Sequence, residues 1–383
     1  MLCIILLAGA WLLSPGFTKS FKTAYQNKIL LLLVSFYTFH VLSVFYSTNL
    51  NYAFFDLQVK LSFIFFPLIL SAFVFSEEQI RRFKLFFVVG TLFGSLLCMG
   101  YVVNSYMQTN DIANTFFYTN YSRFLHPAYF TIYLNIAQLF LLEAFFTPPG
   151  KSKLYRAGLF ITMLILWISI TLLSSRTAYV VSIATVFAYL VVLFIQRKIQ
   201  KKYLIFPLLL IVTVAAMQWV SVGFYNRYTQ INEAIQSTPQ ESQTTPLHTE
   251  KNSTTTHYLI WQNVLGLVKQ HPVFGVGIGD VHDELNKEYL KNNFQYGIEK
   301  DFNPHNQFLH TMVSLGSIGL ILLLGLFILP VYITWENKEW VYLFFLAVVF
   351  LNCMTESVLE RQAGIIFFAF FYSLFTMRNQ QRV

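Results

Sequence analysis

The chain alternates between long apolar blocks and short polar connections. The blocks are roughly 15 to 25 residues long, the length that a helix needs to cross a hydrocarbon core of ~30 Å. The pattern therefore predicts an all-α polytopic membrane protein. We expect eleven spans, at about residues 1–14, 29–46, 60–75, 84–103, 127–146, 155–173, 177–195, 203–222, 306–333, 340–354 and 362–377.

Composition agrees with a membrane protein. The 383 residues are 56% hydrophobic and only 11% charged, whereas about a quarter of the residues in a soluble domain are charged. The net charge of +8 does not indicate nucleic-acid binding, because the basic residues form short clusters between apolar blocks. Cys3, Cys98 and Cys353 lie in apolar runs without metal-ligand spacing, so we expect neither a disulfide nor a metal site. The first apolar run has no small-residue cleavage site, which favours a retained span.

The basic residues also predict the orientation. One set of connections carries most of them, and the short connections of the other set carry only Lys60, Arg123, Arg176 and Arg361. Because basic connections face the cytoplasm, the long connection 223–304 is expected on the outer side. The predicted organisation is residues 1–222 with about eight spans, 223–304 as an external loop with short helices, and 305–383 with about three spans.

Candidate chemistry begins at Asn303-Pro304-His305-Asn306-Gln307, where the long external connection meets an apolar run. Asn303 suits an N-cap and Pro304 suits the first helical position, so His305 is expected in the first turn. The positive end of a helix dipole favours a neutral imidazole, which accepts a proton, and it also attracts phosphate. Asn306 or Gln307 is expected to orient His305.

Cations at other predicted outer ends suit an anionic ligand. Arg176 follows Ser174-Ser175 and is expected in a first helical turn, where the dipole repels a cation. Its partner is either a lipid headgroup or a bound anionic ligand, and we favour the ligand. Arg123 and His126 end an aromatic connection; they are either interfacial residues or part of a ligand site.

The long connection contains two expected helices, one from His257 to His271 and one from Val281 to Asn292. The glycines between them have neither the spacing nor the βαβ context of a dinucleotide site, so we expect a tight turn. Arg227, early in the same connection, is a further cation. In the last external turn, Glu356 is either a solvated residue or the carboxylate that orients a His or Arg.

Three motifs carry a resemblance to a known family. They are P-H-N-Q-F-L-x(5)-L-G-x-I-G-L from Pro304, W-x(10)-P-x-F-G-V-G-x-G-D from Trp261, and the S-R-T-A turn at Arg176. Together they resemble the O-antigen ligase and polymerase superfamily of bacterial inner membranes. This resemblance implies about twelve spans and a GT-C-like fold. The family usually has Arg four residues before the Trp, where this chain has His257.

The resemblance implies a glycosyltransferase with its active site on the periplasmic face. The donor would be a glycan on undecaprenyl diphosphate, and the acceptor would be lipid A core or another glycan, with no cofactor. His305 would act as the base, while Arg176, Arg227, Arg123 and His257 would stabilise the leaving diphosphate without a metal. Asn306 or Gln307 would orient His305 or bind sugar hydroxyls, and Arg123 and His126 would help to line the glycan or phosphate site. We expect a ligase; a polymerase and a protein O-oligosaccharyltransferase use the same parts. A transporter is the rival class, but it would require ionisable residues in mid-span and internal repeats.

Overall fold

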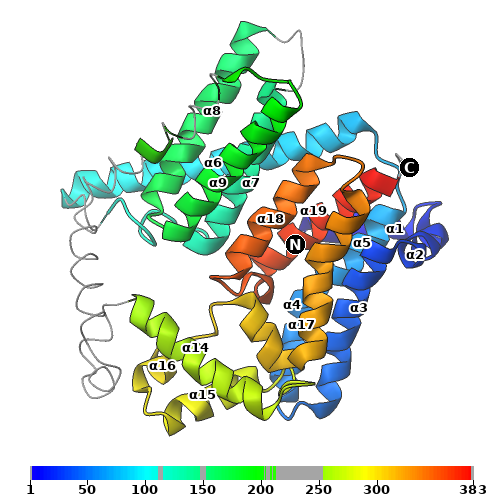
Figure 1. The fold of residues 1–383 in the computed structure, drawn as a ribbon, viewed down its shortest axis with the longest axis vertical. Helices are drawn as coiled ribbons and strands as arrows, with labels where there is room; N and C mark the ends of the chain where they lie inside the picture. Colours follow the sequence, from blue (N-terminus) through cyan, green and yellow to red (C-terminus); the bar gives the residue numbers. More distant parts are fainter. Residues whose placement is uncertain are drawn as a thin grey trace. The chain divides into compact units, whose positions relative to one another are not determined.

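We describe residues 2–110, 115–146, 152–201, 203, 208, 210–212 and 253–380 in a computed structural model of the chain (Figure 1). These residues form helices joined by turns, with no strand among them. The helices are α1 (Leu2–Leu12), α2 (Phe17–Gln26), α3 (Lys28–Ser43), η1 (Val44–Tyr46), α4 (Leu50–Lys60), α5 (Ser62–Ser71), α6 (Glu77–Thr109), α7 (Pro127–Phe146), α8 (Lys153–Leu172), α9 (Arg176–Ile195), α14 (Ser253–Gln270), α15 (Val281–Lys291), α16 (Gln295–Glu299), α17 (Gln307–Thr334), α18 (Trp340–Cys353), η3 (Val358–Glu360) and α19 (Gln362–Gln380).

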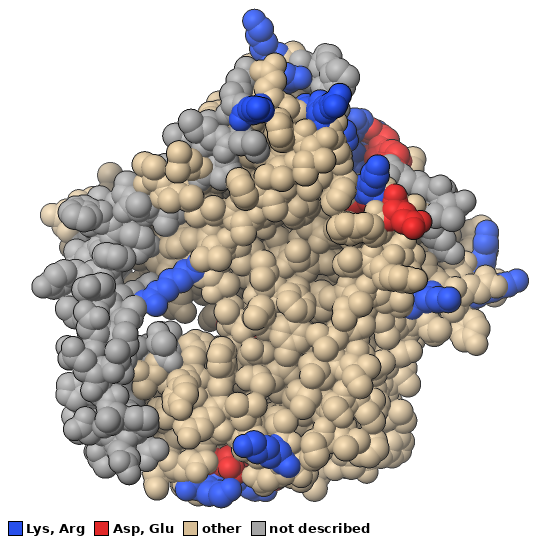
Figure 2. Space-filling model, viewed as in Figure 1, with Lys and Arg blue, Asp and Glu red and all other residues tan. Residues whose placement is uncertain are grey.

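Seven helical segments in the described residues are long and apolar enough to cross a membrane. They are Lys28–Tyr46, Leu50–Ser71, Glu77–Thr109, Pro127–Phe146, Lys153–Leu172, Arg176–Ile195 and Gln307–Thr334. The predicted class, an all-α polytopic membrane protein, is confirmed. On the face drawn in Figure 2, wide areas of the described surface carry no charged side chain, as a lipid-facing surface requires. Most of the predicted span 203–222 lies outside the described residues.

The described residues fall into two compact units. The first contains α1 to α5, α14 to α17, η3 and α19, and the second contains α6 to α9 and α18. In the first unit α17 packs along α3, and α19 packs along α5 (Figure 1). In the second unit α7 packs against α6, α8 and α9.

The helices α14, α15 and α16 share a small apolar core with the start of α17. Ile260 and Val264 of α14 face Leu285 and Tyr289 of α15, and Val313 of α17 completes the cluster. All five side chains are nearly inaccessible to solvent. The two helices and the turn predicted for this part of the long connection are therefore confirmed.

That turn is held in a break of α17. Gly316 has φ 65°, a left-handed conformation that interrupts the helix, and a Cβ there would overlap the backbone of Val273. The amides of Val276 and Gly277 donate to the carbonyls of Val313 and Ser314 at 2.8 and 3.0 Å, which the break frees from the helix. Glycine is required because only it accepts this backbone conformation at such close approach. The glycine-rich turn between α14 and α15 is therefore hydrogen-bonded to the L-G-x-I-G-L segment of α17 and packed against it.

One predicted span was misplaced. Lys60 was expected in an external connection before a span at 60–75, but it is the last residue of α4, inside the candidate span Leu50–Ser71, and only 2% exposed. Its ammonium lies 2.5 Å from Asp56 Oδ1 one helical turn earlier. An ion pair spaced by four residues lets a helix carry both charges through an apolar region, so the charge does not mark the end of the span.

Candidate functional site

The helix that follows His305 begins later than the sequence predicted. Asn306, not Asn303, is the N-cap: its Oδ1 accepts from the amides of Phe308 and Leu309 at 2.9 and 3.1 Å. Asn303 instead accepts from the amide of His305 at 2.8 Å, which closes a local turn before the helix. Asn306 is fixed as the cap because its Nδ2 also donates to the carbonyl of Met354 at 3.0 Å. His305 therefore precedes the cap and lies outside the first turn.

The backbone of His305 is held in an uncommon conformation. Its φ of 46° is in the left-handed region, which costs energy for a residue with a side chain. Fixed neighbours compensate for that cost: Asn303 binds its amide, and the Trp261 indole donates to the Pro304 carbonyl at 3.0 Å. Strain that is held in place from several sides is typical of functional positions.

The structure brings three of the predicted residues together around the His305 ring. His305 Nδ1 lies 3.4 Å from Glu356 Oε1, and the two side chains are 26% and 15% exposed. The His257 ring is 5.2 Å from that of His305, at an interplanar angle of 73°. A carboxylate at Nδ1 favours the tautomer that carries its proton there, which leaves Nε2 as the proton acceptor. These contacts join α14, the start of α17 and the turn before η3.

His257 is a weaker cation here than the Arg of the resembling family. Burial lowers the pKa of His257 below 6.5, and the neighbouring His305 lowers it further, while Glu356 acts in the opposite direction. The imidazole is therefore neutral in most molecules at pH 7 in the unliganded protein.

Gln307 connects this group to a buried ionic cluster. Its Nε2 donates to Glu360 Oε1 at 2.7 Å, and its Oε1 accepts from the Leu359 amide at 2.6 Å. Glu360 Oε2 lies 2.5 Å from the Lys60 ammonium and 3.2 Å from His310 Nε2. Burial alone would raise the pKa of Glu360, but His310 and Lys60 outweigh it and hold that pKa below its usual value. Gln307 is 1% exposed, so its amide faces the interior of the protein.

Arg176 belongs to the second unit and is the first residue of α9, as expected. Ser175 caps that helix by accepting from the Ala178 amide at 3.3 Å. Ser174 before it takes a left-handed conformation, φ 49°, which makes the connection from α8 abrupt. The Arg176 side chain is exposed and is thus accessible to an anionic ligand.

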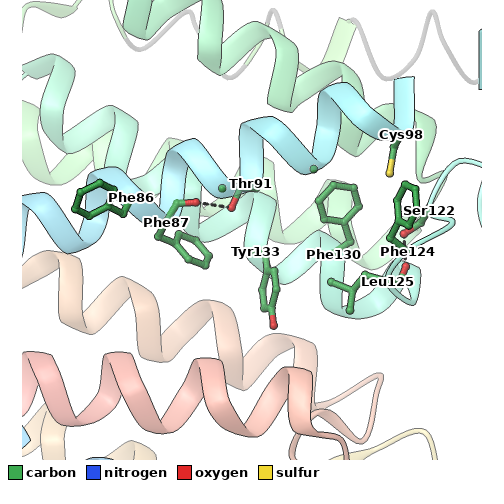
Figure 3. A pocket seen from close by; sticks show the side chains of 11 residues that line it. Phe86, Phe87, Thr91, Cys98, Ser122, Phe124, Leu125, Phe130 and Tyr133 are labelled. Carbon is green, nitrogen blue, oxygen red and sulfur yellow. Dashed lines mark hydrogen bonds between the residues drawn. The ribbon is translucent and has the colours of Figure 1, made fainter. Parts of the chain in front are cut away.

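Arg123 and His126 precede α7 in the same unit, and both are exposed. The Arg123 guanidinium lies over the Tyr101 ring, 4.6 Å from its centre, a cation–π contact of the interfacial type. An apolar pocket of about 430 Å³ lies beside this connection. Figure 3 shows Phe87, Phe130 and Tyr133 lining it together with Ser122, Phe124 and Leu125.

Two further residues of the long connection remain, Arg227 and Asp280. Arg227 lies outside the described residues. Asp280, at the end of the glycine-rich turn, has a structural partner: its carboxylate accepts from the Thr48 amide and hydroxyl and from the Asn49 amide at 2.8 to 3.0 Å. It fastens the α14–α15 turn to the connection between η1 and α4.

Sequence reasoning missed Lys60, Asp56, Glu360 and His310 as a group. The sequence favours Glu356 over Glu360, because Glu360 and its neighbour Arg361 would not face each other on a helix. The available signal was the Asp56–Lys60 pair, spaced by four residues in an apolar stretch. The contact of Lys60 with Glu360 spans 300 positions, and no local pattern indicates it.

Comparison with known proteins supports the motif resemblance. Residues 161–324 match the O-antigen ligase family; this range contains Arg176, His257 and the Asn303–Gln307 segment. A protein of Haemophilus influenzae, recorded as an uncharacterized protein, is 26% identical over 155 residues, which are 38% of this chain and 36% of that protein. The similarity thus covers little more than a third of that relative. Residues 161–324 of this chain are therefore similar to the O-antigen ligase family.

Proposed function

We propose that the protein transfers a glycan from undecaprenyl diphosphate to an acceptor hydroxyl at the periplasmic face of the inner membrane, with lipid A core as the acceptor. The observation that carries the proposal is the His305 ring, held by a strained backbone, with Glu356 at Nδ1 and His257 beside it. A base fixed in this way suits deprotonation of a hydroxyl. The family match supports glycan transfer in general.

In the proposed reaction, His305 Nε2 takes the proton of the acceptor hydroxyl. The hydroxyl oxygen attacks the anomeric carbon, the bond from that carbon to the diphosphate oxygen breaks, and the configuration is inverted. Glu356 orients the ring and stabilises its positive charge after proton transfer. The leaving undecaprenyl diphosphate carries the negative charge away.

Cations rather than a metal are proposed to stabilise that leaving group. Arg176, Arg227 and Arg123 are assigned to the diphosphate from the sequence resemblance, with Arg176 first because a guanidinium binds phosphate oxygens in a bidentate way. His257 is assigned to the same ligand in its protonated form. Asn306 and Gln307 bind the protein itself, so we assign them to holding the His305 segment rather than to binding sugar.

A transporter would require ionisable residues in mid-span, and the span Leu50–Ser71 does contain Asp56 and Lys60. Both are paired with each other, and Lys60 is also paired with Glu360. A closed ion-pair cluster favours a structural or positioning role, so we retain the transferase.

Deletion of the gene tests the proposal and separates its variants. Polymer on the lipid carrier with none on lipid A supports ligation. Single repeat units on lipid A assign polymerisation, and unglycosylated membrane or secreted proteins assign protein glycosylation. An unchanged set of surface glycans and glycoproteins would contradict glycan transfer by this protein.

A further inference from the structure

The buried cluster of Lys60 and Glu360 is an unusual place for charge. Lys60 is 2% exposed, and the side chains of Asp56 and Glu360 are 10% and 13% exposed. Charges inside a membrane protein are costly to desolvate, and an ion pair does not by itself make a protein more stable than an apolar alternative. The cluster therefore calls for an explanation other than stability.

The cluster is connected to the turn that carries Glu356. This turn, residues 354–360, is fastened to the start of α17 at each end. Asn306 binds the Met354 carbonyl, and Gln307 binds both the Leu359 amide and Glu360. Asn306 and Gln307 directly follow His305. The same contacts thus fix the segment of the base and the segment of its carboxylate.

Lys60 fixes Glu360 from the opposite side. One carboxylate oxygen of Glu360 faces Gln307, and the other faces Lys60 at 2.5 Å and His310 at 3.2 Å. Lys60 is in turn anchored by Asp56 within α4. Without Lys60, Glu360 would keep its contacts to α17 but lose the ion pair that ties it to α4.

We propose that Lys60 is a positioning residue for the acceptor base, because it fixes Glu360 and thereby the turn that sets Glu356 against His305. This inference rests on the proposed role of His305 as the base. It assigns to Lys60 an effect on the chemical step, because a displacement of about 1 Å at a reacting group costs up to roughly a hundredfold in rate.

Two variants of the full-length protein test the proposal while limiting misfolding. Lys60→Met/Asp56→Asn removes one positive and one negative charge together, and Glu360→Gln keeps the Asp56–Lys60 pair. Lys84→Met is the matched control: Lys84 forms a buried ion pair with Glu143 at 2.5 Å in the second unit. Thermal unfolding of each purified protein identifies any variant that has lost its fold.

Two readouts separate positioning from a structural role. With the lipid-linked donor extracted from the deletion strain, kcat should fall about tenfold to a hundredfold, while KM for the donor stays within twofold of wild type. Carbethoxylation of His305 by diethyl pyrocarbonate, followed by mass spectrometry, should be several-fold faster in both variants. The carbethoxylation rate of the exposed His271 should be unchanged. Lys84→Met should match wild type in both readouts.

The inference is overturned if a folded variant keeps the kcat of wild type. It is also overturned if His305 of a folded variant is carbethoxylated at the wild-type rate. A fall in kcat and stability that Lys84→Met reproduces also overturns it, because the effect would then be structural. His305→Ala separates the two proposals. Normal transfer by that variant refutes the base, whereas the carbethoxylation comparison of wild type with the Lys60 variant still decides whether Lys60 positions the His305 segment.

Discussion

We predict that replacement of His257 by Arg removes the pH dependence of donor binding. In the unliganded protein, burial and the adjacent His305 lower the pKa of His257 below 6.5, so the imidazole is neutral above that value. A bound diphosphate favours the protonated ring. Binding must then take up a proton, and affinity falls as pH rises above the pKa of the free protein.

The size of this effect follows from the geometry. Two unit charges 5.2 Å apart, the separation of the His257 and His305 rings, repel by about 1 to 3 kcal/mol for effective dielectric constants between 80 and 20. A positive charge on His305 therefore opposes protonation of His257, and a bound diphosphate adds negative charge that offsets this effect. Because binding takes up one proton, the Kd rises with pH by up to about tenfold per pH unit. This holds in the range between the pKa of His257 in the free protein and its pKa in the complex. The guanidinium of the His257→Arg variant would carry its charge throughout, so the Kd of that variant should be nearly independent of pH.

The assay is binding of the lipid-linked glycan donor to purified protein by intrinsic tryptophan fluorescence between pH 6 and 8. His271→Arg is the matched control, because it adds the same charge at an exposed position just after α14. Wild type and His271→Arg should lose affinity as pH rises, and His257→Arg should not. Equal slopes for wild type and His257→Arg would refute the reasoning and assign the diphosphate to other cations.

Two further predictions concern the second unit and the metal question. Arg176→Lys should lose most of the transfer activity although it keeps the charge, because an ammonium lacks the planar fork that binds two phosphate oxygens; near-normal turnover in membranes would remove Arg176 from that role. Addition of EDTA to purified protein should leave the transfer rate unchanged if cations stabilise the leaving group, and strong inhibition reversed by a divalent cation would contradict the proposed metal independence.

Local patterns predicted the membrane-spanning class and the candidate base because both depend on residues close in sequence. The start of α17 was misassigned because Asn303 and Asn306 are both good N-caps. The choice between them depends on Met354, whose carbonyl Asn306 binds. No local sequence pattern indicates this contact, because the two residues are 48 positions apart.

The same limit applies to charge. Lys60 was placed outside the membrane because charged residues usually mark the ends of spans, and this holds only for unpaired charges. Its second partner, Glu360, is distant in sequence and belongs to a short turn. Glu356 was recognised as a candidate from its chemistry, but only the structure places it 3.4 Å from His305 Nδ1.

The central claim is that His305 is the base that activates the acceptor. Its most direct test is the single-turnover transfer rate of purified His305→Ala, with binding of the lipid-linked glycan donor measured on the same sample. We predict a loss of about two to four decades in rate, the usual contribution of a general base, with donor binding retained. A folded variant that keeps more than about a tenth of the wild-type rate would lie outside that range and would contradict the claim.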